Sequence, residues 1–271
     1  MNLDHLPPLR DVLDAHDLAA KKSFGQHFLF DLNITRKIAR LAGVGAGDHV
    51  IEVGPGPGGL TRALLETGAQ VTAVEKDPRF LPLLAELGEA ANGALTVHLD
   101  DALTADETAL AAGRPTAIVS NLPYNVGTPL LIKWLTGPFT PTSLTLMFQK
   151  EVAERIVAAP GSDAYGRLAV IAQATADARL VMEVSPRAFT PPPKVTSAVV
   201  HLVPHAQRLD QALLESLQTL TAAAFGQRRK MLRSSLKQLG GETICEAAGI
   251  DPSRRAETLD VEEFLKLARA R

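Results

Sequence analysis

The sequence predicts an α/β fold: a mostly parallel sheet of seven strands with helices on both faces, followed by a small all-helical domain. Two observations predict it. Short apolar runs alternate with helical patterns through the first 204 residues, and only helical patterns remain after Pro204. A chain of 271 residues is long enough for one large domain or two unequal ones. We therefore expect a first domain over 1–204 and a second over 205–271.

Each of the first four expected strands ends at residues that can bind a ligand. The first ends at a glycine run, and the next three end at Glu75, at Asp100 and Asp101, and at Asn121. Right-handed crossovers put the carboxyl ends of parallel strands at one edge of the sheet, where open α/β sheets bind ligands. We therefore expect the site at this edge. The expected strands are 49–53, 70–74, 95–99, 116–120, 143–148, 180–184 and 198–203.

Helical patterns connect the strands and make up the C-terminal domain. Two connecting helices are expected at 60–66 and 80–87. In the second domain, Gly240–Gly241 and Asp251–Pro252 interrupt the helical pattern. The helices expected there are 209–225, 229–239, 243–248 and 261–270.

The composition excludes several classes of protein. Hydrophobic residues make up 46% of the chain and charged residues 21%, which are globular rather than disordered values. Cys245 is the one cysteine, so neither an intrachain disulfide nor a cysteine-based metal site is expected, and a reduced, cytoplasmic setting is favoured. We expect no bound metal. No apolar run approaches the roughly 18 residues of a membrane span, and residues 1–13 do not resemble a signal peptide.

The charges are unevenly distributed along the chain. Residues 41–186 carry nine Lys or Arg against sixteen acids, whereas residues 187–240 carry eight against two. Five of those cations lie within ten residues and have no acid among them. Such a cluster can bind phosphates of a nucleic acid, although a solvated basic face is the alternative. The five are Arg228, Arg229, Lys230, Arg233 and Lys237, of which 229, 233 and 237 would share one face of the expected helix.

The glycine run after the first strand predicts a nucleoside-containing ligand. Gly54, Gly56 and Gly59 lie between the strand and the next helix, and Glu75 ends the second strand. Glycine lets the backbone approach a ligand closely, and a carboxylate at that position accepts both ribose hydroxyls of a nucleoside. The alternative is a glycine turn that only packs the helix on the strand.

The same pattern fits a dinucleotide, but the neighbouring residues favour S-adenosylmethionine. Pro55 and Pro57 remove two N–H donors that a diphosphate cradle would use. Glu52 puts a carboxylate beside the loop, which suits the ammonium of a methionine group better than a phosphate. Asp101 can accept a hydrogen bond from an adenine amino group, or it can simply cap a helix.

The segment from Ser120 to Asn125 has features needed to methylate an adenine amine. The Asn121 side-chain oxygen and the carbonyl of Leu122, fixed by Pro123, can accept the two N6–H bonds and direct the nitrogen lone pair. Tyr124 can stack on a base that has left its helix. An ordinary β-turn containing proline is the alternative.

These motifs and others occur in the order of a known family. The chain resembles the ribosomal small-subunit RNA adenine dimethyltransferases nearly from end to end. The matching segments are 22–29 (KSFGQHFL), 52–56 (EVGPG), 75–77 (EKD), 121–125 (NLPYN), 189–197 (FTPPPKVTS) and 225–230 (FGQRRK). One departure is Asp100-Asp101-Ala102, because the family usually has Gly-Asp-Ala there.

The resemblance implies a Rossmann-like class I methyltransferase domain with an N-terminal extension that contacts RNA or cofactor, and a helical C-terminal domain that binds rRNA. It implies N6,N6-dimethylation of two adjacent adenosines in the 3′-terminal hairpin of 16S rRNA, during maturation of the 30S subunit. The expected partner is 16S rRNA in the immature 30S subunit, and we expect a monomer with no membrane contact.

The resemblance also assigns residues to roles. The residues implied at the S-adenosylmethionine site are Gln26, His27, Leu29, Gly54, Gly56, Glu75, Lys76, Asp101, Ala102 and Asn121. Those implied at the target base are Asn121, Leu122, Pro123, Tyr124 and Phe189, with Tyr124 and Phe189 on its two sides. Those expected to contact RNA are Lys22, Arg228, Arg229, Lys230, Arg233 and Lys237.

Two of these assignments have plain structural alternatives. Phe189 precedes Pro191-Pro192-Pro193, whose stiff backbone would mount an aromatic ring facing a base, but Phe189 can equally be a core residue. His27 can be a structural histidine.

Three rival functions remain open at this point. The first is an NAD-dependent oxidoreductase, for which no proton donor is found in the sequence. The second is a 23S-type rRNA adenine methyltransferase, against which the 189–197 and 225–230 segments argue. The third is an assembly factor that binds the immature 30S particle, with methylation secondary.

Overall fold

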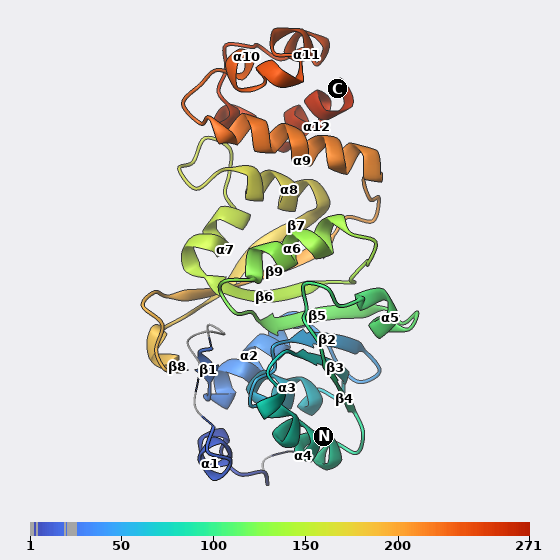
Figure 1. Cartoon of the computed structure of the whole chain (residues 1–271), viewed down its shortest axis with the longest axis vertical. Coiled ribbons are helices and arrows are strands. Elements are labelled where there is room, and N and C mark those ends of the chain that lie inside the picture. The colour runs from blue at the N-terminus through green and yellow to red at the C-terminus, as the bar shows by residue number, and fades with distance from the viewer. Residues whose placement is uncertain (1–2, 4, 19, 21–25) are drawn as a thin grey trace. The chain divides into compact units, whose positions relative to one another are not determined.

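The computed structural model describes residues 3, 5–18, 20 and 26–271. Its centre is a seven-stranded sheet with the strand order β4-β3-β2-β5-β6-β9-β7 (Figure 1). The expected fold class is therefore confirmed, including the number of strands. The strands are β2 (His49–Val53), β3 (Gln70–Glu75), β4 (Leu95–Leu99), β5 (Thr116–Asn121), β6 (Leu144–Gln149), β7 (Ala176–Val184) and β9 (Ser197–Pro204).

The sheet is parallel from β4 to β6, and β9 runs antiparallel to β6. All residues of β2 and nearly all of β5 and β6 are buried, as expected for strands covered on both faces, whereas most of edge strand β4 is exposed. His49 joins three strands, because its ring nitrogens bond Thr72 of β3 and Thr116 of β5, each at 2.8 Å. Burial lowers the pKa of His49 to about 4, so the ring is neutral at pH 7.

Helices and a short pair of strands complete the first part of the chain. The helices are α1 (Leu9–Ala15), α2 (Leu32–Ala42), α3 (Gly59–Glu66), α4 (Leu81–Ala90) after a 3-10 turn η2 (Pro78–Phe80), α5 (Glu107–Ala111), α6 (Gly127–Thr136) and α7 (Lys150–Ile156). Strands β1 (Phe28–Leu29) and β8 (Phe189–Thr190) pair antiparallel, and η3 (Pro186–Ala188) precedes β8. The core beneath β1 contains Leu29, Ile38 and Val199.

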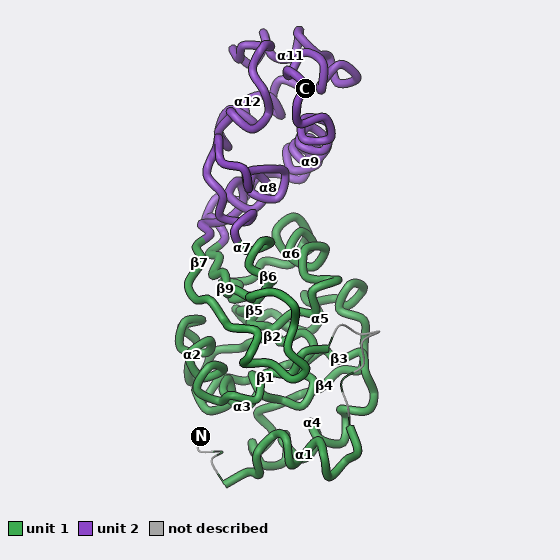
Figure 2. Tube along the Cα trace, turned by 90° about the vertical axis from the view of Figure 1, so that its left-hand side faces the viewer, with its two compact units in different colours: residues 1–153, 179–203 green, residues 154–178, 204–271 purple. Residues whose placement is uncertain are grey.

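The chain divides into two compact units (Figure 2). The first unit is 1–153 with 179–203, and the second is 154–178 with 204–271. The second unit thus also takes in 154–178, which the sequence analysis assigned to the first domain. The reason is that α8 (Arg167–Thr175), six of whose nine residues are buried, packs on α9 (Gln211–Gly226) and α12 (Val261–Arg269).

The prediction of one helix over 229–239 is wrong. The structure has instead α10 (Leu232–Ser235) and a 3-10 turn η4 (Lys237–Leu239), followed by α11 (Glu242–Ala247) and η5 (Ala256–Thr258). The backbone around Met231 forms an isolated bridge with Arg255, and the Leu232 N–H donates to the Arg254 carbonyl. These contacts replace the helical hydrogen bonds, so the basic residues of this segment do not form one helical stripe.

Candidate active site

One cavity lies at the carboxyl ends of β2, β3, β4 and β5. All ten residues that the sequence analysis assigned to the cofactor line it, together with Leu122, Pro123 and Tyr124. Glu52, Asp100 and Leu103 also line it, as do several apolar residues that no motif singled out, such as Phe28 and Val126. The structure thus brings together residues that are up to about a hundred positions apart in the sequence.

Glu75 is the centre of a hydrogen-bond network at the floor of the cavity. Its carboxylate accepts the N–H of Gly56 at 3.0 Å and the N–H of Asp77 at 2.7 Å. Asp77 in turn accepts a hydrogen bond from Gln26 at 3.1 Å and pairs with Arg79 at 2.6 Å. Burial raises the pKa of Glu75, whereas the Arg79 guanidinium lowers the pKa of Asp77 to about 2. This network fixes the position of the Glu75 carboxylate.

The glycine loop has the backbone shape that only glycine adopts easily. Gly54 and Gly56 have φ angles of +67° and +53°. A Cβ atom at Gly56 would contact the Phe28 ring at 3.5 Å, and one at Gly54 would contact the Pro123 ring at 3.6 Å. The loop therefore packs closely between β1 and the 121–124 segment.

Glu52 is a buried carboxyl that faces the cavity. It is 1% exposed, and its Oε2 atom has no hydrogen-bond partner among the residues that the structure describes. Burial raises its pKa to about 8, and the neighbouring Glu75 charge acts in the same direction. The Thr61 hydroxyl opposes this rise in pKa only in part. A buried carboxyl that has no cation beside it in the described part of the chain and faces a cavity is suited to a cationic group of a ligand.

Asp101 lies across the cavity from the glycine loop. Its carboxylate pairs with Lys76 at 2.7 Å and accepts the Leu103 N–H at 3.0 Å. The hydrogen bond with Lys76 lowers the pKa of Asp101, so the group is ionised at pH 7. The additional carboxylate, Asp100, accepts the N–H of Asp101 at 2.7 Å and so caps this turn locally.

The 121–124 segment also lines the cavity. Ser120 donates to the Val53 carbonyl at 2.5 Å, which ties the end of β5 to the end of β2 and fixes where Asn121 emerges. The Tyr124 hydroxyl bonds Ser197 at 2.6 Å, and burial raises its pKa. The His27 ring lies 5.6 Å from the Tyr124 ring between centroids, and its Nδ1 atom donates to the Pro191 carbonyl at 2.8 Å. His27 therefore both lines the cavity and holds the Pro191 segment.

Phe189 does not line the cavity. It is 3% exposed and packs in the core with Leu29 and Val199. The expected pair of rings around a base, Tyr124 with Phe189, is therefore not formed, and the core alternative fits the structure. The sequence alone could not separate base stacking from core packing, because an apolar aromatic residue at this position suits either role.

The expected RNA contacts lie in the second unit, except for Lys22, which is outside the described residues. Arg228, Arg229, Lys230, Arg233 and Lys237 are all exposed. Arg228 is engaged within its own unit, because its guanidinium donates to the Asp163 carbonyl at 2.8 Å and lies 3.6 Å from Glu257.

Comparisons with known proteins agree on one family. Residues 18–270 match the family model described as ribosomal RNA adenine dimethylase. The chain is 73% identical to the ribosomal RNA small subunit methyltransferase A of Phenylobacterium zucineum, over 100% of this chain and 94% of the relative.

Two solved structures are similar over most of the chain. A dimethyladenosine transferase from Plasmodium falciparum has a TM-score of 0.74 at 27% identity, covering 89% of this chain and 96% of that one. The 23S rRNA methyltransferase ErmE has a TM-score of 0.67 at 28% identity, covering 90% of this chain and 98% of that one.

Proposed function

The chain belongs to the ribosomal RNA adenine dimethylase family and is an S-adenosylmethionine-dependent rRNA methyltransferase, and on that basis we propose how its cavity works and what it modifies. The target is N6 of two adjacent adenosines in the 3′-terminal hairpin of 16S rRNA, within the immature 30S subunit. The much higher identity to the small-subunit relative than to the 23S enzyme supports this choice.

The cavity has a complementary group for each part of the cofactor. Glu75, held by two backbone N–H groups, accepts the ribose hydroxyls. Asp101 accepts a hydrogen bond from the adenine amino group. Glu52, whose Oε2 atom has no partner among the described residues, receives the methionine ammonium and so gains the partner it lacks. This buried carboxyl is the observation that best supports S-adenosylmethionine over a dinucleotide, because an ammonium stabilises its ionised form whereas a diphosphate offers it no positive charge.

The 121–124 segment presents the target base. When bound, the cofactor supplies an electrophilic methyl carbon on a sulfonium. The Asn121 side-chain oxygen and the Leu122 carbonyl accept the N6–H bonds, so that the nitrogen lone pair is directed out of the ring plane. Tyr124 stacks on the extruded base. No strong base is required, because the protonated amine product loses its proton readily to water.

The exposed basic residues of the second unit contact RNA phosphates. Arg229, Lys230 and Arg233 supply three of these charges. Among the described residues, no helix is both long and apolar enough to cross a membrane. Since the substrate is a ribosomal subunit, we place the enzyme in the cytoplasm, acting as a monomer.

Incubation with S-adenosylmethionine labelled at its methyl group and unmethylated small subunits tests the proposal. We expect N6,N6-dimethyladenosine at two adjacent positions of the 3′-terminal hairpin after nucleoside mapping, and no label in large subunits offered as a control. Label in large-subunit rRNA, or only monomethylated adenosine after complete reaction, would contradict the proposed target.

A further inference from the structure

The turn after β4 carries the residues that face the adenine end of the cavity. Asp101, Ala102 and Leu103 all line the cavity. The Asp101 carbonyl accepts the N–H groups of Thr104 and Ala105, each at 2.9 Å, and the Asp101 side chain accepts the Leu103 N–H. These bonds close the turn on itself. At its start, the Asp100 N–H donates to the Glu75 carbonyl at 3.0 Å and Asp101 pairs with Lys76 at 2.7 Å, which joins Asp101 to the end of β3. None of these bonds connects residues 102–105 to the sheet or to a helix.

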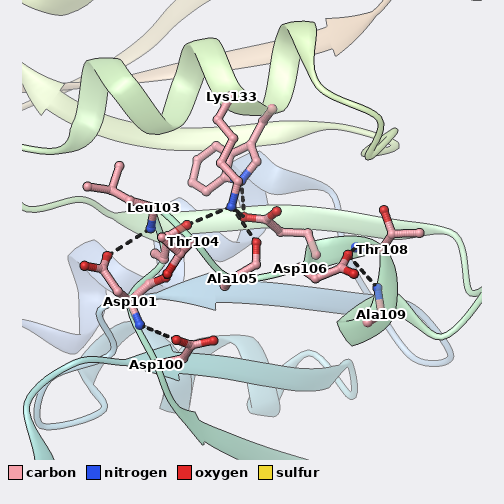
Figure 3. Close-up of polar contacts among 12 residues, drawn as sticks. Asp100, Asp101, Leu103, Thr104, Ala105, Asp106, Thr108, Ala109 and Lys133 are labelled. Atoms are coloured by element: carbon pink, nitrogen blue, oxygen red, sulfur yellow. Dashed lines mark hydrogen bonds and ion pairs between the residues drawn. The ribbon is translucent and has the colours of Figure 1, made fainter.

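Lys133 of α6 connects this later part of the turn to a helix (Figure 3). Its ammonium donates to the carbonyl of Ala102 at 2.9 Å, to the carbonyl of Ala105 at 2.6 Å and to Glu107 Oε1 at 2.8 Å. An ammonium has three N–H bonds, so this residue is fully used in holding the turn and the start of α5. No motif in the sequence pointed to Lys133.

The acceptors of this ammonium are largely withdrawn from water. Glu107 is 4% exposed and Ala105 is also 4% exposed. Glu107 Oε1 is shared with the indole N–H of Trp134, which donates at 2.8 Å. Loss of the ammonium would leave the Ala105 carbonyl without this donor and Glu107 with Trp134 alone, and the turn would have to move for the carbonyl to reach water.

We propose that Lys133 is a positioning residue for the cofactor: it fixes the 101–105 turn so that Asp101 meets the adenine amino group. The inference rests on the proposed function, because it takes the cavity as the cofactor site. Lys133 itself is not in the cavity lining, so it acts on the ligand only through the turn.

The test uses two ligands that differ at one group. The first is S-adenosylhomocysteine, and the second is its 6-deamino analogue, in which a hydrogen atom replaces the adenine amino group and N1 is unchanged. Asp101 accepts a hydrogen bond from the amino group and finds no donor at that position in the analogue, so the wild type should prefer the first ligand. The preference, measured as the ratio of two calorimetric dissociation constants, reports how well Asp101 is placed.

Lys133→Met removes the ammonium but leaves Glu107 as a buried, poorly paired carboxylate. The double variant Lys133→Met/Glu107→Gln removes that charge as well. The amide oxygen at position 107 can still accept a hydrogen bond from Trp134. The double variant is therefore the one to measure if the single variant does not fold. Lys133→Arg keeps donors for the carbonyls. Lys150→Met is the matched control, because Lys150 forms an ion pair with Glu183 at 2.7 Å and does not line the cavity.

We expect the double variant to bind S-adenosylhomocysteine about 10-fold more weakly, the equivalent of one hydrogen bond, with a much smaller loss for the 6-deamino analogue. Lys133→Arg should retain most of the preference, and Lys150→Met all of it. A folded double variant that keeps the wild-type preference would overturn the inference. Wild-type protein that binds neither ligand would refute the proposed function itself, and the inference with it.

Discussion

The carboxylate of Glu75 accepts the backbone N–H of Gly56 at 3.0 Å. This bond joins the end of β3 to the glycine loop that follows β2, and a second bond from the Asp77 N–H fixes the other carboxylate oxygen. The ribose acceptor and the glycine loop are thus joined directly by hydrogen bonds.

Glu75→Gln should weaken S-adenosylhomocysteine binding by roughly 10- to 100-fold, because a glutamine amide offers one acceptor where two backbone N–H groups need two. Calorimetry measures the effect. Glu89→Gln, an exposed glutamate on α4, serves as the control and should bind as the wild type does. Unchanged affinity in Glu75→Gln would remove Glu75 from the ribose site.

Asn121→Ala should reduce methyl transfer by about 100-fold or more, the usual cost of removing a positioned polar group at a reacting centre. Binding to unmethylated small subunits should remain near normal, because Asn121 touches one base whereas the exposed cations contact many phosphates. The two quantities are measured on the same protein by label transfer and by co-sedimentation. Equal loss of both would favour the assembly-factor function over the assigned role of Asn121.

Binding of the cofactor should release a proton from Glu52. Burial raises the pKa of this carboxyl to about 8, so the free protein holds the proton at pH 7. A methionine ammonium lowers that pKa again, so the proton leaves on binding, and affinity falls as the pH drops below about 8.

Calorimetry in buffers of different ionisation enthalpy counts this proton. At pH 7 the wild type should release close to one proton per S-adenosylhomocysteine bound, and Glu52→Gln should release none. If the variant releases as many protons as the wild type, the source is another group and Glu52 does not meet the ammonium.

Replacing the exposed cations of the second unit should weaken RNA binding in a salt-dependent way. The triple variant Arg229→Ala/Lys230→Ala/Arg233→Ala should bind RNA with a less steep salt dependence. The magnitude of the slope of log affinity against log salt should fall by about two to three, since three phosphate contacts are lost. Arg228→Ala should lower it less, because its guanidinium is already engaged by Asp163 and Glu257. Filter binding of the hairpin at several salt concentrations gives both slopes; equal slopes in the triple variant and the wild type would place the RNA elsewhere.

Phe189→Ala should lower the free energy of unfolding by about 3–5 kcal/mol, the usual loss when a buried aromatic ring is truncated. In the fraction that remains folded, S-adenosylhomocysteine affinity should be close to that of the wild type, because Phe189 does not line the cavity. Urea unfolding and calorimetry measure the two effects. A variant of wild-type stability that fails to capture the base would restore the stacking role.

Most of the strands could be predicted because each is a short apolar run that ends at a glycine or a polar residue. The strand β7 begins four residues before the expected 180–184, because Asp177 and Arg179 interrupt the apolar pattern. The expected bounds of β2 and β4 match the structure residue for residue. The break in the expected helix 229–239 could not be predicted. The N–H groups of Leu232 and Arg233 donate to the carbonyls of Arg254 and Pro252, some twenty positions away.

The site residues also divide into those that local sequence predicts and those that depend on distant contacts. Glu75, Asp101 and Asn121 could be placed at the cavity because each directly follows or ends a strand whose carboxyl end lies at the ligand edge. Lys133 could not, since an isolated lysine on a helix carries no sign of the three acceptors that folding places around it. Phe189 had two acceptable roles, and its burial in the folded core favours one of them.

A crystal structure of the protein with S-adenosylhomocysteine tests the central claim most directly. We predict the ribose hydroxyls on Glu75, the adenine amino group beside Asp101, the ligand ammonium on Glu52 and the sulfur facing Asn121. Ligand density outside this cavity, or a ligand inside it with the ribose turned away from Glu75, would contradict the account.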